Sequence, residues 1–314
     1  MEYKYCLSDG SLLKDNSTNG WSLSSIKKMF GVSTLPTLDI TPKILEEIAS
    51  EQVNKKYTVP GVQTKLSLGL STNKKEHKLT IVNYPIGYIL KPKVEEDYPE
   101  GENLVMVMAD LVKIQTVPHG LIELNNHSLA YLTKRIDRNE LTKYPMEDFC
   151  QLSKRLTEDK YNSSYERCKK IISQYSSQVI YDETELFIRL VFCFLTCNSD
   201  MHLKNFSLIS KDDQYRLSEA YDMLPVNVLL PNDKEETALT LNGKKKNLHR
   251  KDFLAFAASG NGKEVIAENV ANKLIDKLLT YKNAFLEEID HSYMCEKHKK
   301  LFKEMMIERF ERLS

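Results

Sequence analysis

Residues that break regular structure are scarce in this chain, since 11 of its 314 residues are glycine and 10 are proline. Collagen-like, low-complexity and repeat architectures need more of them or a visible period, and neither is present. No segment reaches the roughly 20 apolar residues of a membrane span, and the N-terminus lacks the apolar stretch of a signal peptide. We therefore expect a globular protein that does not contact a membrane.

An excess of charge of one sign is also lacking. Lys and Arg together number 44, and Asp and Glu together number 44, so no overall field would draw the chain to nucleic acid. Hydrophobic residues make up 41% of the chain, which suits the core of one large or two modest domains.

The six cysteines have no spacing typical of a disulfide framework. Cys193 and Cys197 share one face of an apolar segment, without a second Cys or His pair nearby. We interpret them as core thiols rather than metal ligands. Such free thiols are typical of a reducing compartment, so we expect a cytoplasmic protein.

Two phosphate-binding motifs are absent. The chain contains no G-x-x-x-x-G-K-[ST] and no G-x-G-x-x-G. The first absence argues against a Walker-type NTPase, and the second against an ordinary protein kinase, whose glycine-rich loop covers ATP.

The most informative stretch is Asn-Ser-Asp-Met-His-Leu-Lys-Asn at residues 198–205. Asp200 stands five residues before Asn205, and Asp222 follows 17 residues later. In protein kinases one carboxylate orients and deprotonates the attacking hydroxyl, while an amide and a second carboxylate hold magnesium. Asp and Asn also cap ordinary loops, so the motif alone leaves a structural loop equally open.

The surroundings favour the kinase interpretation. Asp182 and Glu185 form a capping-box pattern that predicts a helix start. The apolar residues that follow cover nearly every face, so we expect a buried helix that ends at Asn198. Two short strands, 206–209 and 215–217, are predicted around a polar turn before Asp222.

The first half predicts a small sheet. Leu-Ser-Leu-Gly-Leu at residues 66–70 alternates as a half-buried strand does. Further strands are expected at residues 78–82, 88–91, 119–124 and 129–134. Glu102 is expected to open an amphipathic helix. We predict an α+β, two-lobed protein-kinase-like fold, with a mainly β N-lobe at residues 1–136 and a helical C-lobe at residues 137–314.

Two further expectations concern the core. Trp21, the only tryptophan, either packs the N-terminal segment or belongs to a partner surface. Residues 263–314 have a helical pattern. One apolar stripe of this segment is expected to be buried, namely Ile266, Val270, Leu274, Leu278 and Leu279.

Lys91 ends the otherwise apolar strand Tyr-Ile-Leu-Lys. A lysine there can bind the α- and β-phosphates of ATP and pair with a helix carboxylate, for which Glu102 is the candidate. An isolated lysine at a strand end more commonly reaches solvent, and that alternative stays open.

Together these pieces resemble the HipA family of bacterial toxin kinases over residues 57–260. The shared elements are Pro-Gly-Val-Gln-Thr-Lys (60–65), Tyr-Ile-Leu-Lys (88–91), Thr-Lys-Arg-Ile-Asp-Arg (133–138), Pro-Met-Glu-Asp-Phe-Cys-Gln (145–151), Asn-Ser-Asp-Met-His-Leu-Lys-Asn-Phe-Ser (198–207) and Tyr-Asp-Met (221–223). Their order and spacing make the resemblance specific.

The resemblance implies a role for each matching residue. Asp200 would be the catalytic base, Asn205 and Asp222 the Mg²⁺ ligands, and Lys91 with Glu102 the phosphate-binding pair. The other implied ATP-binding residues are Pro60, Gly61, Val62, Gln63, Thr64 and Lys65 of a phosphate loop, Lys134, Arg135 and Ile136 at an adenine hinge, and His202, Lys204 and Tyr221. The implied cofactors are ATP and Mg²⁺.

Within the family the chain looks most like HipT, the short kinase of the three-gene HipBST toxin–antitoxin system, because the segment before residue 57 is short. HipT-like loops can carry two autophosphorylated serines. The corresponding residues here are Thr58 and Pro60, and proline has no hydroxyl, so Thr58 is the expected autophosphorylation site.

The resemblance also implies partners. They are a protein substrate, expected to be an aminoacyl-tRNA synthetase, a small HipS-like protein and a HipB-like helix-turn-helix antitoxin. Nucleic acid is then contacted only through the antitoxin, and delivery to another cell stays open. A pseudokinase-like ATP-binding module and a small-molecule kinase remain as alternatives.

Overall fold

The computed structural model describes residues 2–14, 19–38, 40, 44, 65–72, 76–82, 87–139, 142–260 and 265–314. The chain forms two compact units. Unit 1 consists of Met1–Val107, Val117–Thr142 and His291–Tyr293, and unit 2 consists of Met108–Thr116, Lys143–Asp290 and Met294–Ser314.

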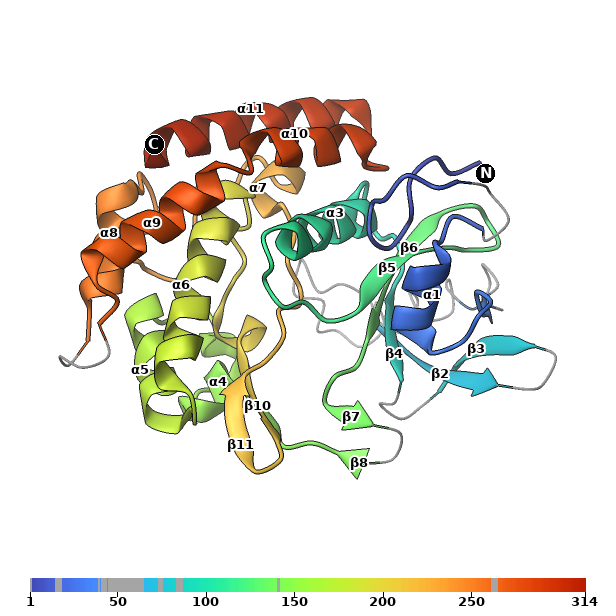
Figure 1. Ribbon diagram of the computed structural model, residues 1–314, viewed down its shortest axis with the longest axis horizontal. Coiled ribbons are helices and arrows are strands. Elements are labelled where there is room, and N and C mark those ends of the chain that lie inside the picture. Colours follow the sequence, from blue (N-terminus) through green and yellow to red (C-terminus); the bar gives the residue numbers. More distant parts are fainter. Residues whose placement is uncertain are drawn as a thin grey trace. The chain divides into compact units, whose positions relative to one another are not determined.

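Unit 1 is built on a six-stranded sheet with the order β1-β3-β2-β4-β6-β5. Figure 1 labels its strands β2 to β6. The strands are β1 (Thr37–Leu38), β2 (Leu66–Thr72), β3 (His77–Ile81), β4 (Tyr88–Lys91), β5 (His119–Glu123) and β6 (Leu129–Lys134). Neighbours are antiparallel except β1 and β3, which are parallel. The strands predicted from the sequence are confirmed, and β1 is an addition to them.

Trp21 belongs to the core of unit 1, where it is fully buried. Its ring lies 5.5 Å from that of Phe30 at the end of helix α1 (Leu23–Phe30). The indole N–H donates to the carbonyl of Leu121 at 2.9 Å. The packing role is therefore confirmed, and the partner-surface alternative is wrong.

Helix α3 (Tyr98–Leu111) begins four residues before Glu102. Pro99 lies in its first turn, where proline is tolerated because the N–H it lacks has no partner within the helix. Residues 99–109 are all buried, so the prediction of an amphipathic helix opened by Glu102 is wrong. Glu102 lies inside a helix that is buried on nearly every side.

Unit 2 is mainly helical. Its helices are α4 (Phe149–Leu152), α5 (Tyr165–Tyr175), α6 (Val179–Leu195), α7 (Val226–Leu229), α8 (Arg250–Ala258), α9 (Glu268–Leu279), α10 (Lys282–His291) and α11 (Glu296–Leu313), with 3₁₀ turns η1 (Thr157–Asp159) and η2 (Leu203–Asn205). An antiparallel sheet has the order β11-β10-β9. Its strands are β9 (Met146–Asp148), β10 (Ser207–Lys211) and β11 (Gln214–Leu217), which confirms the predicted hairpin. The short strands β7 (Arg138–Asn139) and β8 (Thr142–Lys143) pair with each other where the chain passes from unit 1 to unit 2.

Helix α6 is largely buried, as predicted, but its bounds differ. It begins at Val179 and ends at Leu195, so the capping box at Asp182 is wrong. The Asp182 carboxylate instead accepts hydrogen bonds from the Ser176 hydroxyl at 2.6 Å and from the N–H of Leu217 at 2.8 Å. This contact ties β11 to the first turn of the helix.

The C-terminal segment buries only part of the predicted apolar stripe. Helix α9 buries Ala271, Ile275 and Leu278, whereas Val270 is 44% exposed. Of the predicted stripe, Ile266 and Leu278 are buried, so the prediction is confirmed in part, whereas Leu274 and Leu279 are half-buried. A stripe at a spacing of four drifts off the buried face, because an α-helix turns every 3.6 residues.

The buried side chains of unit 2 include free cysteines and two arginines, Arg189 and Arg309. Cys193 and Cys197 are buried free thiols, which confirms their interpretation as core residues. Burial raises the pKa of Cys193 to about 12. The Arg309 guanidinium donates to the carbonyl of Phe194 at 2.7 Å and to the side-chain oxygen of Asn227 at 2.6 Å. Arg309 thereby ties α11 to the end of α6 and to α7.

Among the described residues, no helix is both long enough and apolar enough to cross a membrane.

We expect Gly120→Ala to destabilise the protein. The added methyl group would lie 2.5 Å from the Trp21 ring, and overpacking a core typically costs about 1–3 kcal/mol. Urea unfolding followed by tryptophan fluorescence measures this, because Trp21 is the only tryptophan. In a Trp21→Phe background, followed by circular dichroism, Gly120→Ala should cost less. Equal losses in both backgrounds would contradict the contact.

Candidate active site

The loop after α6 is held by hydrogen bonds to its main chain. Cys197 has a φ of 61°, a left-handed conformation that often ends a helix. The N–H of Asn198 donates to the Cys193 carbonyl at 2.8 Å. The side-chain oxygen of Asn198 accepts from the N–H of Asp200 at 3.2 Å. The polar residues after the helix therefore fix the main chain of Asp200.

Asn205 closes the same loop from its other end. Its side-chain nitrogen donates to the Asp200 carbonyl at 2.8 Å, and its backbone N–H donates to the His202 carbonyl at 2.9 Å. Asn205 is 5% exposed. The five-residue spacing in the sequence thus corresponds to one closed loop. Since the amide nitrogen is used within that loop, the amide oxygen is the group that can serve as a ligand.

Asp222 follows the hairpin of β10 and β11. Its φ is 60°, a left-handed conformation that is uncommon outside glycine and is frequent at functional sites. The hydroxyl of the preceding Tyr221 lies 2.6 Å from the Ser207 hydroxyl and donates to the Lys204 carbonyl at 3.1 Å. Tyr221 therefore holds the segment that carries Asp222 next to the loop of Asp200.

Two other carboxylates, those of Asp222 and Asp233, act on the charge of Asp200. Burial is the main cause that raises the pKa of Asp200, and the negative charges of Asp222 and Asp233 also raise it. A hydrogen bond from Tyr161 and the positive charge of Lys160 act in the opposite direction. A carboxylate with a raised pKa is a stronger base, and repulsion among the three carboxylates favours a bound cation.

Two further predicted site residues, His202 and Lys204, have surroundings that define their charge or contacts. Burial, followed by the positive charge of Lys160, lowers the pKa of His202 to about 4, so its imidazole is neutral at pH 7. The Lys204 ammonium donates at 2.7 Å to the carboxylate of Asp148, which also caps α4. Their placement near ATP phosphates stays a prediction.

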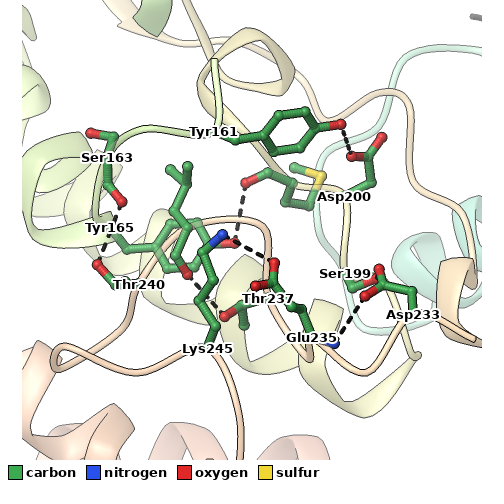
Figure 2. A network of polar contacts seen from close by, with 12 residues as sticks. Tyr161, Ser163, Tyr165, Ser199, Asp200, Asp233, Glu235, Thr237, Thr240 and Lys245 are labelled. Atoms are coloured by element: carbon green, nitrogen blue, oxygen red, sulfur yellow. Dashed lines mark hydrogen bonds and ion pairs between the residues drawn. The ribbon is translucent and has the colours of Figure 1, made fainter. Parts of the chain in front are cut away.

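Two residues around Asp200 have no signal in the sequence (Figure 2). The Tyr161 hydroxyl donates to Oδ1 of Asp200 at 2.7 Å. The Ser199 hydroxyl donates to the Asp233 carboxylate at 3.3 Å. Tyr161 lies 39 residues before Asp200 and Asp233 lies 34 residues after Ser199, in polar stretches without a motif.

Unit 1 holds the predicted ion pair. The Lys91 ammonium donates to Oε1 of Glu102 at 2.6 Å, with the two side chains 4% and 0% exposed. Lys91 ends β4 opposite Tyr131 on β6, and its ammonium lies 5.3 Å from the centre of the Tyr131 ring. The solvent-exposed alternative for Lys91 is therefore wrong, while its contact with ATP stays a prediction.

The expected adenine hinge follows β6. The backbone N–H of Lys134 donates to the carbonyl of Pro118 at 2.9 Å, and the N–H of Arg135 donates to the carbonyl of Gly87 at 2.8 Å. These two N–H groups are therefore already bonded within unit 1, and the contact of residues 134–136 with adenine stays a prediction.

The phosphate loop is the part of the predicted site with the least structural information. Lys65 is exposed immediately before β2. The remaining predicted residues lie outside the described residues, namely Thr58, Pro60, Gly61, Val62, Gln63 and Thr64.

Comparison with protein families identifies the class of this chain. The model of the HipA-like C-terminal domain matches residues 57–284, which is more than half of the chain. The chain therefore belongs to the HipA-like C-terminal domain family of kinases.

Curated relatives carry kinase names. One from Haemophilus influenzae, named "Putative kinase", is 30% identical over 193 residues, which cover 56% of this chain and 54% of that protein. "Putative kinase Y4dM" from Sinorhizobium fredii is 31% identical over 245 residues, which cover 71% of this chain and 58% of that protein. The chain thus spans somewhat more than half the length of these relatives.

Solved structures share the fold. HipA from Shewanella oneidensis MR-1, in a toxin–antitoxin complex with HipB and operator DNA, matches with a TM-score of 0.67 and 18% identity, over 82% of this chain and 65% of that chain. The proinflammatory kinase CtkA from Helicobacter pylori matches with a TM-score of 0.55 and 17% identity, over 78% of this chain and 93% of that chain. The predicted α+β kinase-like fold is confirmed.

We expect Glu102→Ala to lower the free energy of unfolding by about 3–5 kcal/mol, because it removes the anion 2.6 Å from a buried ammonium. Replacing both charges, as in Lys91→Met with Glu102→Gln, should cost much less. Chemical denaturation of the single and double variants measures the difference. Equal losses would mean that the two charges do not stabilise each other.

Proposed function

We propose that this chain is an ATP-dependent serine/threonine protein kinase. The observation that supports this most is the closed loop in which Asn205 bonds the Asp200 carbonyl at 2.8 Å while the charge of Asp222 acts on Asp200. Unit 1 would supply most of the N-lobe proposed at residues 1–136, and unit 2 most of the C-lobe proposed at residues 137–314. The kinase names of the relatives are consistent with this proposal.

The donor atoms of unit 2 fit Mg²⁺. The Asn205 amide offers an oxygen because its nitrogen is bonded to Asp200, and Asp222 offers a carboxylate. Hard oxygen donors of this kind are those that Mg²⁺ prefers. Burial, and after it the negative charges of Asp222 and Asp233, raise the pKa of Asp200, and a divalent cation would relieve the repulsion among these charges.

The proposed reaction moves the γ-phosphoryl group of ATP to a hydroxyl. Bound Mg²⁺–ATP supplies the phosphoryl donor, with part of its charge neutralised. Asp200 orients the acceptor hydroxyl and takes its proton as the oxygen bonds to phosphorus. The bond to the β,γ-bridging oxygen breaks, and ADP leaves with that electron pair. Lys91, fixed by Glu102, would bind the α- and β-phosphates, and His202 and Lys204 would lie near them.

The biological role is proposed from the family. HipA from S. oneidensis is a toxin in a complex with HipB and operator DNA, and we extend that role to this chain as a HipT-like toxin. Its partners would be a HipS-like protein and a HipB-like antitoxin, through which alone it would reach DNA. Its target would be an aminoacyl-tRNA synthetase.

We expect Asp200→Asn to reduce phosphoryl transfer by about 10²–10⁴-fold, the usual effect of losing a general base. ATP binding should change little, because the proton is taken only during transfer. Transfer of γ-³²P from ATP to the chain itself and to myelin basic protein measures the rate. Calorimetry measures ATP affinity.

Three outcomes decide among the alternatives. Near wild-type transfer by Asp200→Asn would remove the proposed base. ATP binding without transfer in the wild type would favour a pseudokinase-like module. ADP formation that rises with an aminoglycoside or sugar, but not with protein, would favour a small-molecule kinase.

Thr58 is the proposed autophosphorylation site, and we expect its phosphate to inhibit ATP binding. A phosphate adds about 1.5 to 2 negative charges beside the anionic nucleotide. Thr58→Ala should lose most self-phosphorylation and keep transfer to protein, while Thr58→Asp should bind ATP weakly. Mass spectrometry that finds Thr58 unmodified and the phosphate elsewhere would rule out this mechanism.

A further inference from the structure

Asp200 has two separate sets of contacts in unit 2. Its main chain is fixed within its own loop, since its carbonyl accepts from the Asn205 side chain and from the N–H of His202, both at 2.8 Å. Its carboxylate is contacted from outside the loop, where the Tyr161 hydroxyl donates to Oδ1 at 2.7 Å (Figure 2). Among the described residues, Tyr161 is the one that donates a hydrogen bond to the Asp200 carboxylate.

Tyr161 is itself held in place next to the loop. It follows the η1 turn, whose Asp159 carbonyl accepts from the N–H of Asn162 at 2.9 Å. The Lys160 carbonyl accepts from the N–H of Leu203 at 3.2 Å, which links the two segments through their main chains. The Tyr161 ring also meets the His202 ring edge-on, with centroids 4.9 Å apart. The hydroxyl is thereby aimed at Asp200 by packing as well as by its own hydrogen bond.

We propose that Tyr161 is a positioning residue for phosphoryl transfer, whose hydroxyl holds Oδ1 of Asp200 so that Oδ2 faces the hydroxyl of the protein acceptor. This inference rests on the proposed kinase function. A carboxylate held at one oxygen cannot rotate freely about its last bond. The second oxygen is then directed before the acceptor arrives, which lowers the entropy cost of the reactive arrangement.

The proton balance agrees with a positioning role. The acceptor O–H bond breaks, its proton goes to Oδ2 of Asp200, and the acceptor oxygen bonds to the γ-phosphorus as ADP leaves. Tyr161 keeps its proton throughout, because burial and the negative charge of Asp200 raise the pKa of its phenol well above the ordinary value. Tyr161 is therefore a lasting hydrogen-bond donor rather than a second base.

Tyr161→Phe tests the proposal, since it removes the hydroxyl and keeps the ring against His202. With myelin basic protein as the acceptor, we expect kcat to fall about tenfold, the scale of one hydrogen bond to a charged group. The KM for ATP should stay within about twofold, because Tyr161 would act on the acceptor side. The matched control is Tyr175→Phe, which is also 40% exposed in unit 2 and should behave as the wild type.

A double variant separates positioning from a general structural effect. If Tyr161 acts through the Asp200 carboxylate, Tyr161→Phe should cause almost no further loss in an Asp200→Asn background. A second tenfold loss there would contradict the proposal. An unchanged or faster Tyr161→Phe enzyme would also contradict it. A phosphate found on Tyr161 by mass spectrometry would do the same, because the phenol would then be a phosphoryl acceptor.

A spectroscopic measurement tests the contact without any activity. With 3-fluorotyrosine at position 161, the ¹⁹F resonance should shift when Asp200→Ala removes the acceptor of the phenol hydrogen bond. An unmoved resonance would overturn the inference about Tyr161. A wild-type protein that phosphorylates no acceptor, together with a shifted resonance, would instead overturn the proposed kinase function and leave the contact standing.

Discussion

The candidate site depends on one hydrogen bond, from the Asn205 side-chain nitrogen to the Asp200 carbonyl at 2.8 Å. This bond closes the loop after α6 and fixes the side chain of Asn205 against the main chain of Asp200. The end of α6, from which this loop starts, is held by Arg309, which donates to the Phe194 carbonyl and to the Asn227 side chain. Because Arg309 is 3% exposed, breaking these bonds would leave a buried charge, so the end of α6 has little freedom to move.

The sequence predicts those parts of the structure that depend on neighbours in the chain. The strands of unit 1 and the β10–β11 hairpin show alternating apolar residues and polar turns, which are local signals. The Asp200-to-Asn205 spacing is also local, because both residues belong to one loop. The Lys91–Glu102 pair is predicted from the sequence only as one of two alternatives, because a lysine at a strand end more commonly reaches solvent and its partner lies 11 residues away.

The features that the sequence fails to predict depend on contacts between distant segments. Asp182 resembles a helix cap, but its carboxylate is bound by the N–H of Leu217, 35 residues away. Tyr161 reaches Asp200 across 39 residues. The sequence of α3 is typical of an amphipathic helix, but residues 99–109 are all buried in the structure. In each case a contact between distant segments decides the outcome, and the contact of Tyr161 also acts on the pKa of Asp200.

The central claim is that Asn205 and Asp222 hold the metal of a bound nucleotide next to Asp200. Calorimetry of ATP binding with and without Mg²⁺ tests it most directly, in the wild type and in Asp222→Asn. The account predicts that Mg²⁺ tightens ATP binding by the wild type about tenfold or more and that Asp222→Asn loses most of this gain. The same gain from Mg²⁺ in both proteins, or no gain in the wild type, would contradict it.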